Sequence, residues 1–290
     1  MSLAKQILRC YNPPVGLYAI LIAGGMLPKS MRHLSSSPVK ALLSVGNMTL
    51  LDRAAAAARN CGLFDGIAAV GNPEVQEKLP EGCVYIPMGE TMVDNVANAY
   101  RHFGGDAHHY VVISPDLPFI DADSLAGFVA AARQSCEVGA LYVTKEDFLR
   151  GIPGAPNRFV RLASGEVTLG SVFFATGAAI RKNIPLIREM YTARKRPWRL
   201  AVFLGWGVVW GLLTSRLRIE TIERRLSLLM DSDVRAIRGS GHGLAYDIDT
   251  LENYEFALSL LNSADSGVSC ESRQLAASTE SRQDRGTLVQ

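Results

Sequence analysis

A glycine pair followed by a lysine is the first group of residues in this chain that could bind a ligand. Gly24 and Gly25 end the apolar run of residues 18–23, which is typical of a buried parallel strand. Glycines let the backbone turn sharply and expose amide N–H groups. A loop rich in Lys, Arg and Ser follows and ends at Lys40. Amides and ammonium groups that converge without blocking side chains can hold a polyphosphate. The alternatives are an ordinary tight turn and a surface lysine.

Three aspartates could add a metal ion to such a site. Asp116 follows the apolar run of residues 110–114, so it lies just past the carboxyl end of a predicted strand, where ligands bind in open α/β sheets. Asp247 and Asp249 lie in an extended segment. We expect their side chains to project to opposite faces, so that only one of them shares a metal with Asp116. Carboxylates with phosphate oxygens and water suit Mg²⁺. Alternatively, Asp116 caps the following turn, and Asp247 caps or orients a neighbouring group.

Strands and helices alternate through the first half of the chain, which is typical of a doubly wound α/β sheet. Thr91 is the predicted N-cap of a helix that begins near Gly89 and ends at Phe103, with Asp94 completing a capping box. The other predicted helices cover residues 49–61 and 123–135, and the predicted strands cover residues 18–23, 66–70, 83–86, 110–114 and 139–144.

The pattern weakens after residue 144. Residues 150–170 are rich in Gly, Pro and Arg and predict a long active-site loop, with short strands at residues 159–161 and 172–174. Residues 178–230 look helical almost throughout, and a last helix is predicted from Leu251 to about Leu261. We therefore expect an extension over residues 1–16, one domain over residues 17–261 with a helical insertion at residues 178–235, and a disordered tail over residues 262–290, where large apolar side chains are few.

Composition excludes several classes of protein. The chain has 290 residues, 48% of them hydrophobic, which is enough for one large domain or one domain with an insertion. A net charge of +2 is too mild to indicate a nucleic-acid binder. The five cysteines are scattered and form no CxxC, which argues against a disulfide framework and a zinc site and favours a reducing cytoplasm. The N-terminus lacks the apolar region of a signal peptide. The sequence contains no GxGxxG motif, which argues against a dinucleotide-binding site.

Several motifs, taken in order, resemble one family. The chain is similar to nucleotidyltransferases with a MobA-like (molybdenum-cofactor-guanylyltransferase-like) NTP-transferase domain, and especially to a bacterial branch with a helical, Arg-rich insertion. The matching segments are IAGG, PVKALLSVGNMTLLDR, GETMVDN, SPDLPF and DIDTLENYEFA, and the resemblance covers about residues 17–261. It implies a GT-A-like (Rossmann-like) fold with a doubly wound, mixed and mainly parallel sheet.

The resemblance also implies a reaction. An acceptor oxygen, from a phosphate or a hydroxyl, would attack the α-phosphorus of a nucleoside triphosphate in line, and pyrophosphate would leave. Such transfer needs charge neutralisation and alignment more than a covalent nucleophile. The resemblance assigns the catalytic roles to Lys40 and Asp116 and implies Mg²⁺ as the cofactor. Two alternatives remain, which are a GT-A-type glycosyltransferase that uses a nucleotide sugar and a non-catalytic nucleotide-binding module.

The nucleotide-binding residues implied by the resemblance are Ala23, Gly24, Gly25, Lys40, Gly89 and Asn95, of which Gly24, Gly25 and Lys40 would face the phosphates. The family usually has a further Gly and an Arg directly after the glycine pair, whereas this chain reads Met-Leu-Pro-Lys at residues 26–29. Lys29 or Arg32 could substitute for that arginine.

The remaining implied ligands lie further along the chain. Asp116 and Asp249 would bind the metal. Asp249 is the second ligand because it directly precedes the threonine of the closing motif. Asn95, after Gly89, resembles the position that contacts the base or ribose; alternatively it is an exposed helical residue.

An anionic acceptor is suggested by three residues of the predicted loop. Arg158 and Arg161 supply positive charge, and Gly170 closes the loop.

An apolar segment from Leu200 to Leu213 follows a stretch rich in Arg and Lys at residues 181–199. It is shorter than the roughly 20 residues that span a bilayer. Trp206 and Trp210 lie one helical turn apart, on one face. One interpretation is a helix packed on the sheet or in a homodimer interface. The other is a peripheral membrane contact at the inner face of the membrane, with a lipid-linked acceptor.

Overall fold

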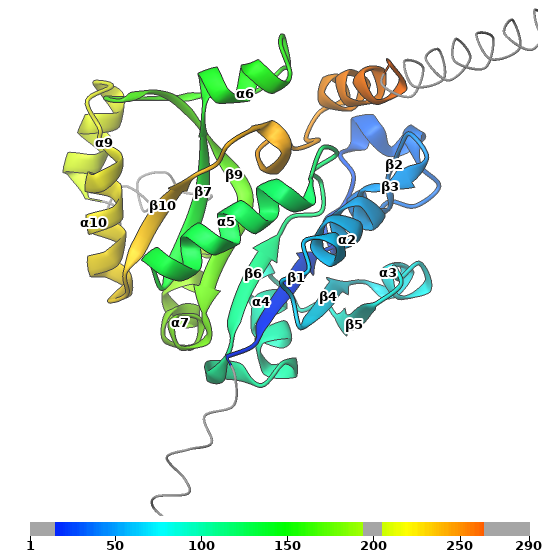
Figure 1. Ribbon diagram of the computed structural model, residues 1–290, viewed down its shortest axis with the longest axis horizontal. Coiled ribbons are helices and arrows are strands. Elements are labelled where there is room, and N and C mark those ends of the chain that lie inside the picture. The colour runs from blue at the N-terminus through cyan, green and yellow to red at the C-terminus, as the bar shows by residue number, and fades with distance from the viewer. Residues whose placement is uncertain (1–14, 194–204, 264–290) are drawn as a thin grey trace, which may run out of the picture.

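One mixed β-sheet forms the centre of the computed structural model, which describes residues 15–193 and 205–263 (Figure 1). The strand order is β10-β7-β9-β6-β1-β4-β5, with β8 paired to β9. β9 runs antiparallel between β6 and β7, and the other pairs along this order are parallel. The predicted mainly parallel sheet is therefore confirmed. The strands are β1 (Leu17–Ile22), β4 (Gly66–Gly71), β5 (Cys83–Pro87), β6 (His109–Ile113), β7 (Val138–Thr144), β8 (Val160–Leu162), β9 (Gly165–Thr176) and β10 (Val234–Arg238).

Helices cover both faces of this sheet (Figure 1). α2 (Leu50–Asn60) and α5 (Ala122–Ser135) contact each other on one face, and α4 (Met92–His102) and α7 (Gly177–Ala193) contact each other on the opposite face. The smaller elements are β2 (Ser44–Val45), β3 (Met48–Thr49), α3 (Pro73–Glu77), α6 (Lys145–Gly151), and the 3₁₀ turns η1 (Lys29–Leu34), η2 (Lys40–Leu42), η3 (Gly105–Ala107) and η4 (His242–Leu244).

Capping boxes fix where two of these helices begin. The Thr91 hydroxyl accepts a hydrogen bond from the Asp94 N–H, and the Asp94 carboxylate accepts one from the Thr91 N–H, as predicted. Thr49 and Asp52 form the same arrangement at α2. Each such cap stabilises its helix by about 1 kcal/mol. The cap at Thr91 also sets the end of the loop after β5, which forms part of the site described below.

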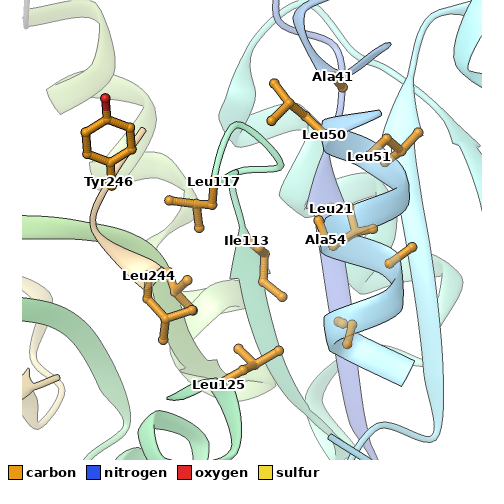
Figure 2. Packing of buried hydrophobic residues seen from close by; sticks show 14 of the residues in the cluster. Leu21, Ala41, Leu50, Leu51, Ala54, Ile113, Leu117, Leu125, Leu244 and Tyr246 are labelled. Carbon is orange, nitrogen blue, oxygen red and sulfur yellow. The ribbon is translucent and has the colours of Figure 1, made fainter. Parts of the chain in front are cut away.

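The larger core lies between the sheet and the α2/α5 layer. Leu21 and Ile113 of the sheet pack against Leu50 and Ala54 of α2 (Figure 2). All four side chains are fully buried. Burying a large aliphatic side chain contributes about 1.5–3 kcal/mol, so this packing holds the carboxyl ends of β1 and β6 in place.

The second half differs from its prediction. The expected loop over residues 150–170 is too long, because the irregular segment after α6 covers only residues 152–159 and leads into an antiparallel hairpin of β8 and the twelve-residue β9. The short strands predicted at residues 159–161 and 172–174 overlap β8 and β9. The hairpin turns at residues 163–164 and enters β9 at Gly165, whose φ of +123° is readily adopted only by glycine.

In the described parts of residues 178–235, which are 178–193 and 205–235, the structure has three helices and part of a strand. They are α7, α9 (Trp206–Leu213), α10 (Ile219–Met230) and the first residues of β10, which was not predicted. A last helix over residues 251–263 is close to the predicted one. The segment at residues 194–204, most of the predicted N-terminal extension and most of the predicted tail lie outside the described residues.

Candidate active site

A cavity of about 340 Å³ lies at the carboxyl ends of the parallel strands. Its walls come from the loops after β1, β5 and β6, together with the start of η2. This is the edge at which open α/β sheets bind ligands. The lining residues are Ile22, Gly24, Gly25, Lys40, Ala41, Met88, Gly89, Glu90, Thr91, Met92, Asn95, Ser114, Pro115 and Asp116. Six residues of the predicted site are among them.

A short antiparallel pairing brings Lys40 beside the glycine pair. Met26 and Val39 form a β-bridge, and the Lys40 N–H donates a hydrogen bond to the Gly25 carbonyl at 2.8 Å. The N–H groups of Gly24 and Gly25 donate to no other group in the part of the chain that the structure describes. A Cβ at Gly25 would meet no atom within 4 Å. The turn therefore has two amides without an acceptor among the described residues and open space beside Gly25, with the lysine at its side.

Three carboxylates meet next to this lysine. One oxygen from each of Asp116, Asp247 and Asp249 lies within 4.8 Å of the others. The Lys40 ammonium donates to Asp116 Oδ2 at 2.6 Å and to Asp249 Oδ1 at 2.7 Å. The other oxygen of Asp116, Oδ1, is buried and has no hydrogen-bond partner among the described residues. A buried carboxylate oxygen without a donor is well suited to a cation, since an unpaired one is costly.

The prediction that Asp247 and Asp249 project to opposite faces is wrong. Residues two apart in an extended segment share a face, and both carboxylates join the cluster around Asp116. Ile248 between them is fully buried in the core. All three aspartates can therefore share one cation.

Core packing fixes the relative positions of these aspartates. The Ile248 N–H donates to the Asp116 carbonyl at 3.1 Å, which joins the two segments directly. Leu117, next to Asp116, and Tyr246, next to Asp247, are fully buried in the same hydrophobic cluster (Figure 2). Apolar neighbours on both segments thus hold the three carboxylates together beside the cavity, which Asp116 lines.

Electrostatics within the cluster perturb two groups. Burial raises the pKa of Asp247 to about 6, with further contributions from the charges of Asp116 and Asp249. Burial on its own lowers the pKa of Lys40, but the nearby carboxylates of Asp116 and Asp249 outweigh it and raise that pKa above its ordinary value. One ammonium therefore faces three carboxylates. An all-oxygen donor set with excess negative charge fits a hard divalent cation.

Asn95 is buried and lines the same cavity, so the alternative that it is an exposed helical residue is wrong. Its Oδ1 accepts a hydrogen bond from the Gly89 N–H at 2.7 Å. Asn95 thereby fixes the turn between β5 and α4.

Other lining residues were not singled out from the sequence. Met88, Glu90 and Met92 lie within or beside the GETMVDN motif, but their side-chain types carry no signal for a nucleotide site. Only the fold brings them to the cavity, since the Thr91 cap ends the loop that carries them.

The predicted acceptor residues do not line this cavity. Arg158 precedes β8 and Arg161 lies on it, both exposed. Gly170 lies inside β9, where a Cβ would come within 2.4 Å of Leu141 Cδ2, so this glycine allows close strand packing. Lys29 and Arg32, the suggested substitutes for the family arginine, are exposed on η1 and do not line the cavity either.

Comparison with known proteins gives a family match in sequence and several similar folds. Residues 19–205 match the family model described as a MobA-like NTP transferase domain. The chain is similar to the structure of a hypothetical transferase from Thermus thermophilus, with 24% identity and a TM-score of 0.73 over 83% of this chain and 100% of that one. No protein of curated function matches the sequence.

Two further structures share the fold. One is 4-diphosphocytidyl-2C-methyl-D-erythritol synthase from Anaerococcus prevotii, with 15% identity and a TM-score of 0.52 over 86% of this chain and 96% of that one. The other is 2-C-methyl-D-erythritol 4-phosphate cytidylyltransferase from Francisella tularensis, with 15% identity and a TM-score of 0.52 over 83% of this chain and 98% of that one. These similarities confirm the predicted GT-A-like fold.

Proposed function

The chain belongs to the MobA-like NTP transferase domain family and is a nucleotidyltransferase, and from this premise we propose its reaction. It transfers an NMP group from a nucleoside triphosphate to a phosphorylated or hydroxyl acceptor, with Mg²⁺ as its metal and pyrophosphate as the leaving group. The observation that carries the proposal is the meeting of Lys40 with three carboxylates beside a cavity that Lys40, Asp116 and the glycine pair line. Transfer of a phosphorus group depends mainly on such positioned charge.

Lys40 has two roles in this proposal. Without ligands its ammonium neutralises Asp116 and Asp249, which it contacts at 2.6 and 2.7 Å. With a triphosphate in the cavity, which Lys40 lines, the same ammonium would pair with phosphate oxygens. The amides of Gly24 and Gly25, beside Lys40, would donate to phosphate oxygens.

Asp116, Asp247 and Asp249 would hold Mg²⁺. When bound, the cation supplies charge neutralisation on the phosphate oxygens and polarises the α-phosphate. The chain's own contribution is to fix the positions of the carboxylates, through the burial of the neighbouring side chains of Ile248 and Leu117 in the core. No group for covalent catalysis is required in this scheme.

We further propose that Glu90 selects the base. Glu90 is exposed and lines the same cavity as Asn95, with which it shares the segment from the loop after β5 into α4. An ionised carboxylate only accepts hydrogen bonds, and it pairs best with two adjacent donors. Guanine offers such a pair, N1–H and the exocyclic amine, so GTP is the preferred triphosphate. Replacing GTP by inosine triphosphate, which lacks that amine, should weaken binding about tenfold, and Glu90→Gln should remove the difference.

The acceptor is proposed by class only, as a small molecule with a phosphate or hydroxyl nucleophile. The scattered cysteines support a cytoplasmic location for the reaction, since free thiols persist in that compartment.

A turnover assay tests the proposed function. The protein is incubated with each of the four triphosphates, Mg²⁺ and a panel of phosphorylated and hydroxylated acceptors, and pyrophosphate is measured. Mg²⁺-dependent pyrophosphate release with one triphosphate supports the proposal. Sugar transfer from a nucleotide sugar without pyrophosphate would favour the glycosyltransferase, and triphosphate binding without turnover across the panel would favour a non-catalytic module.

A further inference from the structure

The helix α9 carries a large apolar face that no described residue covers. Trp206, Trp210 and Leu213 are 73%, 70% and 75% exposed. They stand at positions i, i+4 and i+7, so they share one side of the helix. Leu212 beside them is 45% exposed. Two adjacent tryptophans on an open surface indicate an interaction site, because such rings are normally buried.

The opposite side of α9 is anchored to the domain. Val208 is 8% exposed and packs in a cluster with Leu162, Val167 and Leu217. A Cβ at Gly211 would lie 3.3 Å from Leu217, so the helix approaches the following segment closely. The exposed tryptophans are therefore presented by a fixed helix at one end of the molecule, next to α10 (Figure 1).

The sequence on both sides of α9 is rich in positive charge. Arg216 and Arg218 follow α9 directly, are exposed, and pair with no carboxylate of the described residues. Residues 190–219 contain no Asp or Glu and six Arg or Lys. Since the whole chain carries only +2, the rest of the sequence is net acidic. The basic charge is thus concentrated in the sequence around α9.

These charges decide between two occupants of the face. A second copy of the chain would bring two basic segments together, which repel each other. An anionic lipid surface instead attracts the arginines while its interface accepts tryptophan and leucine side chains. The helix is eight residues long, about 12 Å, and none of the helices in the described ranges is long and apolar enough to cross a bilayer. Contact would therefore be interfacial.

We propose that the face formed by Trp206, Trp210, Leu213, Arg216 and Arg218 binds the surface of an anionic lipid bilayer. The aromatic and leucine side chains enter the interface, and the arginines contact the headgroups. This face is built by α9 and the segment after it, whereas the cavity is built by the loops after β1, β5 and β6. Docking would thus place the enzyme at a membrane through elements that do not form the nucleotide cavity.

Flotation of the full chain with vesicles tests the proposal. We expect it to float with phosphatidylcholine vesicles that contain phosphatidylglycerol and to stay in solution with phosphatidylcholine alone. Trp206→Ser with Trp210→Ser should lower vesicle partitioning about tenfold or more. Arg216→Gln with Arg218→Gln should lower vesicle partitioning about thirtyfold, and added salt should also lower the partitioning of the wild type. Val84→Ser, at the β5 edge and 41% exposed in the wild type, is the matched control and should float normally.

Three results would overturn the proposal. The first is a wild-type protein that stays in solution with anionic vesicles. The second is a tryptophan double variant that floats as well as the wild type. The third is a wild-type dimer in light scattering that the tryptophan variant converts to monomers without any vesicle binding, which would assign the face to a second copy. Because both tryptophans are exposed, the variant should keep its melting temperature to within about 2 °C, so loss of flotation would not reflect unfolding.

Discussion

Removing the charge of Lys40 should have opposite effects on the metal-free and metal-bound protein. Lys40→Met keeps the aliphatic stem and deletes the ammonium that contacts Asp116 and Asp249. Three carboxylates within 4.8 Å would then face one another without a cation. We expect the metal-free variant to be less stable than the wild type and to bind a divalent cation more tightly.

The magnitude follows from the exposure of the two pairs. The Lys40 side chain is 14% exposed and that of Asp116 is 12% exposed, whereas that of Asp249 is 68% exposed. Breaking a buried pair costs about 3–5 kcal/mol, and breaking an exposed one about 0–1 kcal/mol. Because Lys40 makes one buried and one exposed contact, we expect the free energy of unfolding to fall by about 2 kcal/mol. For a chain of this size, this corresponds to a decrease of about 4–8 °C in Tm. Removal of the repelling ammonium should tighten metal binding about tenfold.

Thermal melts at increasing Mg²⁺ or Mn²⁺ measure both effects. The matched control is Lys145→Met, which removes a lysine paired with Glu166 at 2.8 Å where both side chains are more than 40% exposed. We expect that control to lose less than about 1 kcal/mol and to show no change in metal affinity. If Lys40→Met is no less stable than the control, or binds metal no more tightly than the wild type, Lys40 does not neutralise the carboxylate cluster.

Three other predictions concern the same cavity. Since burial raises the pKa of Asp247 from 3.8 to about 6, the folded protein retains a proton that the unfolded chain releases. Without metal it should therefore lose stability from about pH 4 to 6, by at most about 3 kcal/mol. Urea melts should show this loss in the wild type and not in Asp247→Asn. Gly25→Val should leave Tm unchanged, because the space around its Cβ is open, and should weaken triphosphate binding about tenfold or more in calorimetry. Asn95→Leu removes the hydrogen bond to Gly89, so it should raise the triphosphate Kd without changing metal affinity, and equal loss of both would contradict the assigned role.

The meeting of the glycine pair and Asp116 at one edge of the sheet could be predicted because local sequence determines it. Gly24, Gly25 and Asp116 each follow an apolar strand, and parallel strands carry such residues to one edge of the sheet. The position of Lys40 depends on the bridge between Met26 and Val39, which pairs residues thirteen apart and leaves no periodic pattern.

Other features depend on long-range contacts. The role of Asp247 was missed because its orientation was assigned to the wrong face, although the buried Ile248 between the two aspartates already indicated that they share one. β10 could not be found from its own sequence, since its place at the sheet edge depends on pairing with β7, almost a hundred residues earlier. Arg158 and Arg161 were grouped with the cavity because residues 150–170 looked like one loop, and the β8–β9 hairpin places them outside its lining.

The most direct test of the proposed metal–nucleotide site is calorimetric titration of the four triphosphates at several Mg²⁺ concentrations. The wild type is compared with Asp116→Asn and with Asp121→Asn. Asp121 caps α5 by accepting a hydrogen bond from the Ser124 N–H, and asparagine caps equally well, so this variant is the matched control. We expect Mg²⁺-dependent binding of a triphosphate that is at least about tenfold weaker in Asp116→Asn and unchanged in Asp121→Asn. Failure of every triphosphate to bind, or binding that needs neither Mg²⁺ nor Asp116, would contradict the proposal.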